Sequence, residues 1–161
     1  MKASEIMTRD PACVTPDDSA RQAAQLMADH DCGCLPVVDS HGSNKVIGVI
    51  TDRDIAVRGV ARGRGSDTPV RDLMTRDATT CPPEADLKEV ERAMSDRQVR
   101  RIVVADADGC ACGIISQADL ARASDRDVSE KDVARVVERI SEPARASAKG
   151  TDDARSATSR I

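Results

Sequence analysis

The 161-residue chain contains one sequence pattern twice, and this duplication constrains its fold more than any other feature. Residues 7–10, with the sequence MTRD, recur as residues 74–77, an offset of 67. The same offset joins Pro16 to Pro83, Met27 to Met94, Asp39 to Asp106 and Gly42 to Gly109. Beyond that glycine the offset is 65, joining Gly48 to Gly113, Thr51 to Ser116 and Asp54 to Asp119. A shorter turn in the second copy explains the change, so the sequence predicts two structurally similar units.

Each copy has the pattern of a strand, a helix, two strands and a second helix. Short extended pieces at 13–15 and 79–81 come first. One helical face is then marked by Ala20, Ala23, Ala24 and Met27, and in the second copy by Leu87, Val90 and Met94. Hairpins are predicted from the apolar runs 35–38 with 46–50 and 102–105 with 113–115, and helices after Thr51 and Ser116. The predicted fold class is α/β (α+β in stricter usage), two βαββα units in pseudo-two-fold tandem.

The repeats define the domain organisation that we expect. Repeat 1 covers residues 1–62, a linker with glycines covers 63–69, and repeat 2 covers 70–124. Because a unit of about 60 residues is only marginally stable alone, the two repeats are expected to share a core. An amphipathic helix is predicted at 125–140, and residues 141–161 have too few apolar side chains to bury and are expected to be disordered.

Composition excludes several classes of partner. The net charge is −4, whereas a nucleic-acid surface needs a basic patch to neutralise phosphates. The chain has no Phe, Tyr or Trp, so aliphatic side chains and backbone would have to hold any adenine ring. Neither a signal peptide nor a run of membrane-spanning length is present, which predicts a cytoplasmic protein without a membrane partner. The two histidines lie in no catalytic pattern, so an enzyme is not expected.

The most informative motif is a hydroxyl residue followed three positions later by a carboxylate. Thr51 with Asp54 and Ser116 with Asp119 both follow a strand and begin a helix. One interpretation is a capping box, in which the two side chains satisfy free N–H groups at the helix start. A second interpretation is a nucleotide site, because a helix N-terminus attracts phosphate and a carboxylate can hold ribose hydroxyls. The sequence leaves both open.

The two copies resemble CBS domains, named after cystathionine β-synthase. The resemblance covers residues 3–124 and depends on the strand LPVVD at 35–39, on residues 48–54 with their copy at 113–119, and on the Met-Thr start of each copy. Together the copies resemble the tandem pair called a Bateman module, and residues 51–55 and 99–101 are similar to stand-alone bacterial pairs of the hypoxic-response type. The resemblance implies a homodimer in which two modules form a flat disc, and a regulatory function in sensing AMP, ADP or ATP.

The resemblance also implies site residues. Asp54 and Asp119 would hold ribose hydroxyls, and Thr51 and Ser116 would face phosphate. The residues implied to pack around the base are Val14, Val37, Ile50, Val104 and Ile115. The ligand would then act on the assembly of the module or on an unidentified target protein, and no cofactor is required.

The two copies differ where a ligand would bind. Copy two has Val103 in place of Pro36 and Cys81 in place of Val14. It also has Arg100 and Arg101 where copy one has Gly33 and Cys34. Because these arginines could neutralise a phosphate, the two clefts are expected to be unequal.

The six cysteines support an alternative function. Cys32 and Cys34 are spaced so that both thiols lie on one face of a strand, near His30, although the spacing is a weak match to a zinc site. The alternatives are therefore a stress-response module that binds metal or is oxidised through cysteine while its clefts stay empty, or a purely structural dimer. Buried thiols that pack as small apolar groups are the simplest interpretation.

Overall fold

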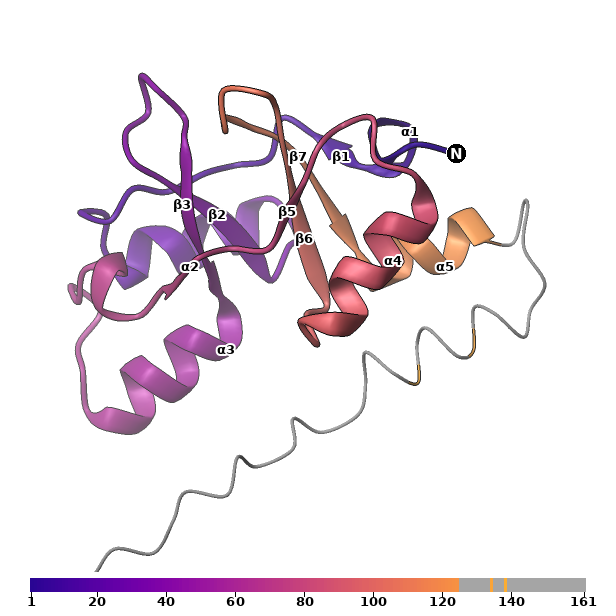
Figure 1. Ribbon diagram of the computed structural model, residues 1–161. Helices are drawn as coiled ribbons and strands as arrows, with labels where there is room; N and C mark the ends of the chain where they lie inside the picture. The colour runs from indigo at the N-terminus through magenta and orange to yellow at the C-terminus, as the bar shows by residue number, and fades with distance from the viewer. Residues whose placement is uncertain (125–133, 135–137, 139–161) are drawn as a thin grey trace, which may run out of the picture.

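The computed structural model describes residues 1–124, 134 and 138 and contains two small sheets with helices on their outer sides (Figure 1). The strands of the first sheet lie in the order β2 (Cys34–Val38), β3 (Val46–Thr51) and β4 (Thr75–Arg76). The second sheet has the order β1 (Thr8–Arg9), β7 (Ala111–Ser116), β6 (Arg101–Ala105) and β5 (Thr80–Cys81). The predicted α+β class is confirmed. The predicted helix at 125–140, apart from the helical residues Ala134 and Glu138, and the tail at 141–161 lie outside the described residues.

The first helix of each repeat begins at a capping box and packs one apolar stripe on its sheet. In α2 (Ala20–Asp29), the cap is Ser19 with Gln22, and in α4 (Leu87–Asp96) it is Asp86 with Glu89. The buried stripe comprises Ala20, Ala23 and Met27 in α2 and Leu87, Val90 and Met94 in α4. The prediction that Ala24 also belongs to the stripe is wrong. Ala24 is exposed because it lines an open hollow between α2 and the second helix of repeat 1.

The second helices occupy corresponding positions but differ in conformation. Repeat 1 has one α-helical turn, α3 (Asp52–Asp54), which continues as the π-helical turn η1 (Ile55–Gly59) and the 3₁₀ turn η2 (Val60–Arg62). In repeat 2 the described part of the helix is regular, α5 (Gln117–Ser124). No helix among the described residues is long and apolar enough to cross a membrane.

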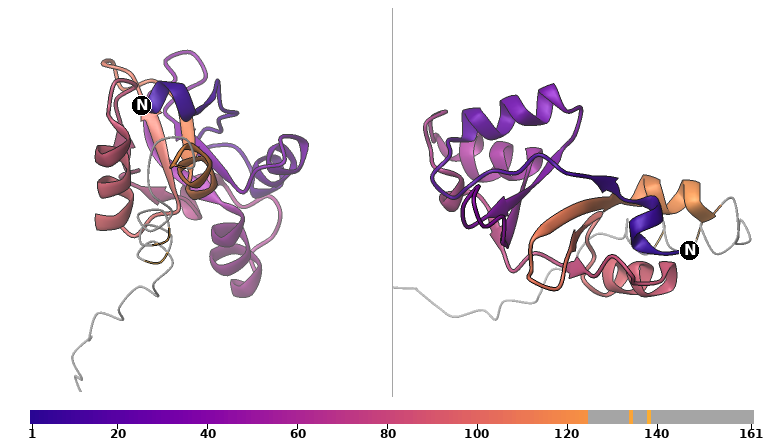
Figure 2. Two further views of the ribbon diagram at one scale, coloured as in Figure 1. Left: turned by 90° about the vertical axis from the view of Figure 1, so that its right-hand side faces the viewer. Right: turned by 90° about the horizontal axis from the view of Figure 1, so that it is seen from above.

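The repeats exchange their leading segments. The short helix α1 (Ala3–Ile6) and strand β1 pack on repeat 2, whereas the 3₁₀ turn η3 (Val70–Asp72) and strand β4 pack on repeat 1 (Figure 2). Equivalent backbone hydrogen bonds fix both segments: Ala3 N to Ala85 O (2.9 Å), Ser4 N to Pro83 O (2.9 Å), Val70 N to Asp18 O (2.7 Å) and Arg71 N to Pro16 O (3.0 Å). Each core is therefore completed by residues from the other sequence repeat.

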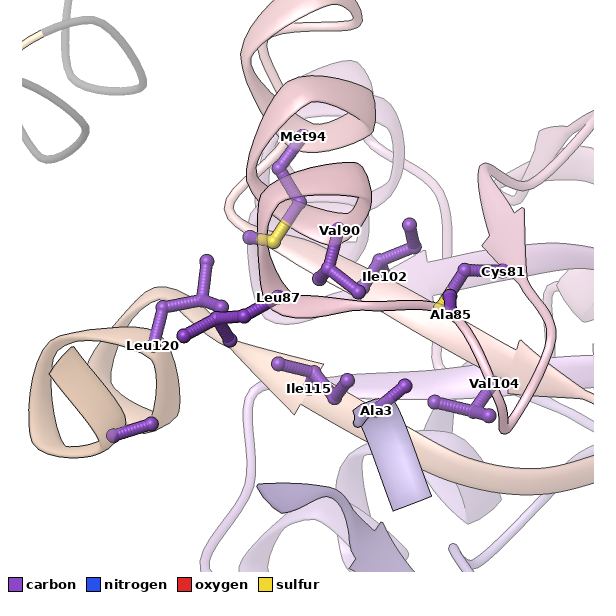
Figure 3. Close-up of a cluster of buried hydrophobic side chains, with 11 residues drawn as sticks. Ala3, Cys81, Ala85, Leu87, Val90, Met94, Ile102, Val104, Ile115 and Leu120 are labelled. Carbon is purple, nitrogen blue, oxygen red and sulfur yellow. The ribbon is translucent and has the colours of Figure 1, made fainter. Parts of the chain in front are cut away.

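Three clusters of buried side chains hold the fold together. The core of repeat 2 includes Ala3 from the exchanged segment, with Ile102 and Ile115 from the sheet and Leu120 from α5 (Figure 3). The core of repeat 1 likewise includes Val70, Leu73 and Met74. A third cluster contains Val38, Val103 and Ala111, which come from both sheets. Since residues of both repeats share this cluster, the expectation of a shared core is confirmed.

The backbone repeats the sequence symmetry. Val46 N donates to Gly109 O and Ala111 N to Asn44 O, both at 3.0 Å, so the two hairpin turns pair about a pseudo-two-fold axis. Left-handed φ angles also recur at equivalent positions: 47° at Asp10 and 57° at Asp77, 48° at Asp31 and 50° at Gln98, and 58° at Asn44 and 81° at Gly109. The pairing of Gly42 with Gly109 that the sequence predicted is therefore wrong, because Asn44 is the structural counterpart of Gly109. The two repeats thus share the backbone conformation of these turns, whereas their second helices differ in conformation.

Candidate functional site

Both predicted hydroxyl–carboxylate pairs form capping boxes. Thr51 Oγ1 donates to Asp54 Oδ2 at 2.8 Å and accepts from the Asp54 N–H at 3.1 Å. Ser116 Oγ donates to Asp119 Oδ2 at 2.6 Å and accepts from the Asp119 N–H at 3.3 Å. The capping interpretation is therefore confirmed. The nucleotide interpretation is compatible with it, because the helix starts remain at the ends of β3 and β7.

The second oxygen of each aspartate is paired with an arginine that the sequence did not identify. Arg58 Nε lies 3.5 Å from Asp54 Oδ1, and Arg122 Nη1 lies 3.1 Å from Asp119 Oδ1. The carboxylate side chains are only 14% and 20% exposed, respectively. A ribose diol would have to share or displace these arginines. The sequence does contain a signal for these two pairs, because each arginine follows its aspartate by three or four residues, the spacing at which side chains meet on a helix.

The five apolar residues expected around a base are core residues in this structure. Val14, Val37 and Ile50 are completely buried in the core of repeat 1, and Val104 and Ile115 in that of repeat 2. Their side chains face the helices because residues alternate between the two faces of a strand. The same alternation places Val49 and Ile114 on the opposite faces, where both are half-buried. A ligand between the repeats would meet these latter residues first.

The arginine expected to neutralise a phosphate lies beside the first repeat. A Cβ at Gly33 would be 2.7 Å from Asp52 Oδ2 and 3.3 Å from Arg101 Nη2, so both charged groups flank the bare Cα. The Asp52 N–H donates to Gly33 O at 3.2 Å, which holds the helix start there. Arg101, which belongs to repeat 2, is thereby placed next to the Thr51–Asp54 box of repeat 1.

The corresponding position in repeat 2 has a different charge. The Gln117 N–H donates to Arg100 O at 3.0 Å, which is the counterpart of the bond between Asp52 and Gly33. The carboxylate of Asp52 is thus replaced by an amide, and the bare Gly33 by the exposed side chain of Arg100. The two helix starts therefore have unequal electrostatic surroundings.

The described cysteines are all free, and burial favours the protonated thiol at several of them. Burial raises the pKa of Cys13 and Cys81 to about 11. Burial also raises the pKa of Cys34 to about 12, although the nearby Arg101 opposes this shift. Because the thiolate is the form that attacks disulfides and binds metals, these thiols are poorly suited to redox chemistry near neutral pH.

The alternative metal site is not assembled. His30 is exposed, Cys32 is half-buried and Cys34 is buried. Within residues 1–124, 134 and 138, no three His, Cys, Asp or Glu side chains are grouped so that they could hold a metal ion.

The two packed βαββα units, each with a hydroxyl–carboxylate pair at a helix start, define a tandem pair of similar domains. Comparison with known proteins gives its class. A sequence model of the CBS domain matches residues 3–59 and 70–126. The chain belongs to the CBS-domain family, and it carries the domain as a tandem pair.

Two relatives consist largely of such a pair. The CBS domain-containing protein YhcV of Bacillus subtilis is 35% identical over 117 residues, which cover 73% of this chain and 81% of YhcV. Hypoxic response protein 1 of Mycobacterium tuberculosis is 33% identical over 121 residues, covering 74% and 82%. An inosine-5'-monophosphate dehydrogenase of Methanocaldococcus jannaschii is 30% identical, but the match covers only 23% of that enzyme.

Three solved structures share the fold. Hypoxic Response Protein I with two coordinated zinc ions has a TM-score of 0.67 and 32% identity, covering 76% of this chain and 98% of that one. CBSX2 in complex with AMP has a TM-score of 0.67 and 25% identity, covering 78% and 96%. The CBS domain pair of MJ0100 with 5'-methylthioadenosine and S-adenosyl-L-methionine has a TM-score of 0.70 and 25% identity, covering 78% and 97%. Structures of this family thus include complexes with adenosine compounds.

Proposed function

We propose that this chain is a regulatory module that binds an adenine nucleotide between its repeats. The observation that carries the proposal is the position of Arg101, a residue of repeat 2, beside the helix start of repeat 1 at Gly33. A phosphate there would meet a guanidinium from the other repeat, and it would compete for the Thr51 hydroxyl and the Arg53 N–H, which donate to Asp54 Oδ2 at 2.8 Å and to Asp52 Oδ1 at 2.7 Å. A ligand held in this way would tie the two repeats together.

The proposed contacts follow the geometry of the two capping boxes. The ribose would be held by Asp54 in one cleft and by Asp119 in the other. The base would lie on the half-buried Val49 or Ile114, with the fully buried valines and isoleucines forming the layer behind them. Because Asp52 adds a negative charge beside Arg101, a monophosphate fits this cleft better than a triphosphate. AMP, the ligand in the CBSX2 structure, is therefore the first compound to test.

We expect AMP to raise the melting temperature of the wild-type protein through mass action. At a concentration 100 times the dissociation constant, the gain in unfolding free energy is about 2.7 kcal/mol. Asp54→Asn and Asp119→Asn keep the size of the side chain but weaken its hydrogen bonds to ribose. Each variant is expected to lose the part of the AMP-dependent rise in melting temperature that comes from binding in its own cleft. A thermal-shift titration would measure this loss.

The matched control is Glu89→Gln, which removes the same charge from the capping box of α4. This variant should keep the full response to AMP. Equal loss in all three variants would show that helix capping, not ligand contact, is being measured. Zinc in the same assay tests the metal alternative. A response to zinc and none to AMP, ADP or ATP would overturn the proposal, and hydrolysis of the nucleotide would contradict a purely regulatory function.

We further propose that the module is a homodimer, with the outer surface of repeat 1 as part of the interface. Val57 and Val60 are 45% and 72% exposed on the second helix of that repeat. Val60 lines a hollow of about 370 Å³ between α2 and η1, together with Ala24, Ala28 and Ile55 among others. Exposed apolar groups beside a hollow are typical of a surface that another chain covers.

The dimer proposal predicts that Val60→Asp converts the protein to a monomer, because a buried, unpaired carboxylate in the interface is strongly unfavourable. Sedimentation velocity would measure the change. Gly42 lies in a hairpin turn, where an added Cβ would meet no other atom within 4 Å. Gly42→Asp adds the same charge there without a steric clash and should leave the dimer intact. A monomeric wild-type protein, or a Val60→Asp dimer of unchanged affinity, would contradict the proposed interface.

A further inference from the structure

Arg58 links the second helix of repeat 1 to the exchanged segment η3–β4 (residues 70–76), which begins repeat 2. Its Nη1 donates to the carbonyl oxygens of Leu73 and Met74, both at 2.9 Å. The side chains of these two residues are buried in the core of repeat 1. Both hydrogen bonds are partly buried, and a backbone carbonyl removed from water is costly to leave unpaired. Arg58 therefore helps to hold the exchanged segment on repeat 1.

The same guanidinium group faces the carboxylate of Asp54. Arg58 Nε lies 3.5 Å from Asp54 Oδ1. The other carboxylate oxygen, Oδ2, already accepts hydrogen bonds from the N–H of Thr51 at 3.0 Å and from its hydroxyl at 2.8 Å. A ribose hydroxyl would therefore meet Oδ1, which can accept it because the contact with Nε is longer than an ordinary hydrogen bond. Arg58 thus orients the oxygen that the proposed nucleotide would use.

The equivalent position in repeat 2 cannot make this connection. The offset of 65 relates Arg58 to Ala123, whose side chain has no hydrogen-bond donor. Asp119 is paired instead with Arg122, whose side chain is 75% exposed. Arg58 also lies in the π-helical turn η1, a conformation that is frequent at functional sites, whereas the described part of α5 is regular. The connection between aspartate and exchanged segment is therefore a feature of repeat 1.

We propose that Arg58 couples nucleotide binding in the cleft of repeat 1 to the docking of the exchanged segment η3–β4 on that repeat. The donors of a guanidinium keep a fixed planar arrangement, so Nε cannot shift at Asp54 without moving Nη1 at the two carbonyls. Arg58 is a positioning residue, because it acts on the nucleotide through Asp54. Coupling is reciprocal, so bound nucleotide favours the docked segment by the factor by which docking favours the nucleotide. The proposal rests on the proposed function and adds a route from the cleft to the connection between the repeats.

The test follows hydrogen exchange with and without AMP in the full chain carrying Asp119→Asn, so that AMP is confined to the cleft of repeat 1. Saturating AMP is expected to slow the exchange of amides in residues 70–76 by at least about fivefold, the lower end of typical coupling between sites. Residues 3–9 form the equivalent segment on repeat 2, where Ala123 stands in place of Arg58. They provide the internal control, and their exchange should slow less than that of residues 70–76.

Two substitutions of Arg58 in this parent separate its charge from its arrangement of donors. Arg58→Ala should lose the AMP-dependent protection of residues 70–76 and bind AMP about fivefold more weakly in calorimetry, as reciprocity requires. Arg58→Lys keeps a positive charge near Asp54, but one ammonium cannot take both positions of the guanidinium. This variant should bind AMP with intermediate affinity and still lose the protection. Arg62→Ala removes the same charge from an exposed position on the following turn and should behave like the parent.

Several results would overturn the coupling while leaving the proposed function in place. They are AMP binding without protection of residues 70–76 in the parent, protection that persists in both Arg58 variants, and equal protection of residues 3–9. AMP binding to the wild-type protein that Asp119→Asn abolishes would also overturn it. If the wild-type protein binds no adenine nucleotide, the proposed function fails and the coupling fails with it. Because Arg58→Lys keeps the charge and most of the side chain, the test does not depend on the folding of Arg58→Ala.

Discussion

Replacing Gly48 with alanine is expected to destabilise the protein by about 3 kcal/mol, the upper part of the range for overpacking. A Cβ at this position would lie 2.5 Å from the carbonyl oxygen of Thr75 and would also overlap Cε of Met74. The methionine can rotate, but the backbone oxygen is held in the pairing of β3 with β4, in which Gly48 is opposite Arg76. Chemical denaturation would measure the loss.

Two further glycines act as controls. At Gly113 a Cβ would overlap only the side chain of Met7, including its Cγ at 2.8 Å. Because this side chain is flexible, Gly113→Ala should cost about 1–2 kcal/mol. A Cβ added at Gly42 would meet nothing within 4 Å, so Gly42→Ala should leave the stability nearly unchanged. Equal effects at Gly48 and Gly42 would contradict the close packing of the exchanged segment on β3.

Truncation of Leu73 is expected to have a comparable effect, a loss of about 2–5 kcal/mol. Leu73 follows the 3₁₀ turn at the start of repeat 2, yet it is completely buried in the core of repeat 1. Its two methyl groups pack near Gly59, where a Cβ would lie 3.7 Å from each of them. Leu73→Ala would leave a cavity in that core. The loss of unfolding free energy can be measured by thermal or chemical denaturation.

Hydrogen exchange distinguishes which repeat is affected. In Leu73→Ala, the amides of α2 should lose protection before those of α4, because the cavity opens in the core of repeat 1. Lys88→Ala, at an exposed position of α4 outside the proposed dimer interface, should change stability by no more than about 0.5 kcal/mol. If α4 lost protection first, the assignment of Leu73 to the first core would be wrong.

The local structure was predictable from the sequence because short-range patterns determine it. The hairpins follow from runs of apolar residues around polar turns, and the helix starts follow from hydroxyl and acidic residues at capping positions. Ala24 was an exception, since its apolar side chain fits the stripe of α2 but faces an open hollow. Periodicity identifies one side of a helix, whereas neighbouring elements decide how much of that side is covered.

The candidate site was predictable only in part. The Thr51–Asp54 and Ser116–Asp119 pairs were evident from their spacing, because both partners lie within one helical turn. The position of Arg101 beside Asp52 depends on the packing of one repeat against the other, which no local pattern specifies. Burial of Val14 and Ile115 in the cores likewise depends on which face of each sheet the helices cover.

The duplication itself determined the two units, their βαββα order and the equivalence of their turns, because residues with the same local sequence adopt the same local backbone. It could not show that residues 1–9 pack on repeat 2 and residues 68–76 on repeat 1, since a repeated sequence fits either copy equally well. Only the tertiary structure resolved this choice, because the connections and the shared cluster of Val38, Val103 and Ala111 fix how the two sheets face each other. The same packing placed Arg101 of repeat 2 at the helix start of repeat 1.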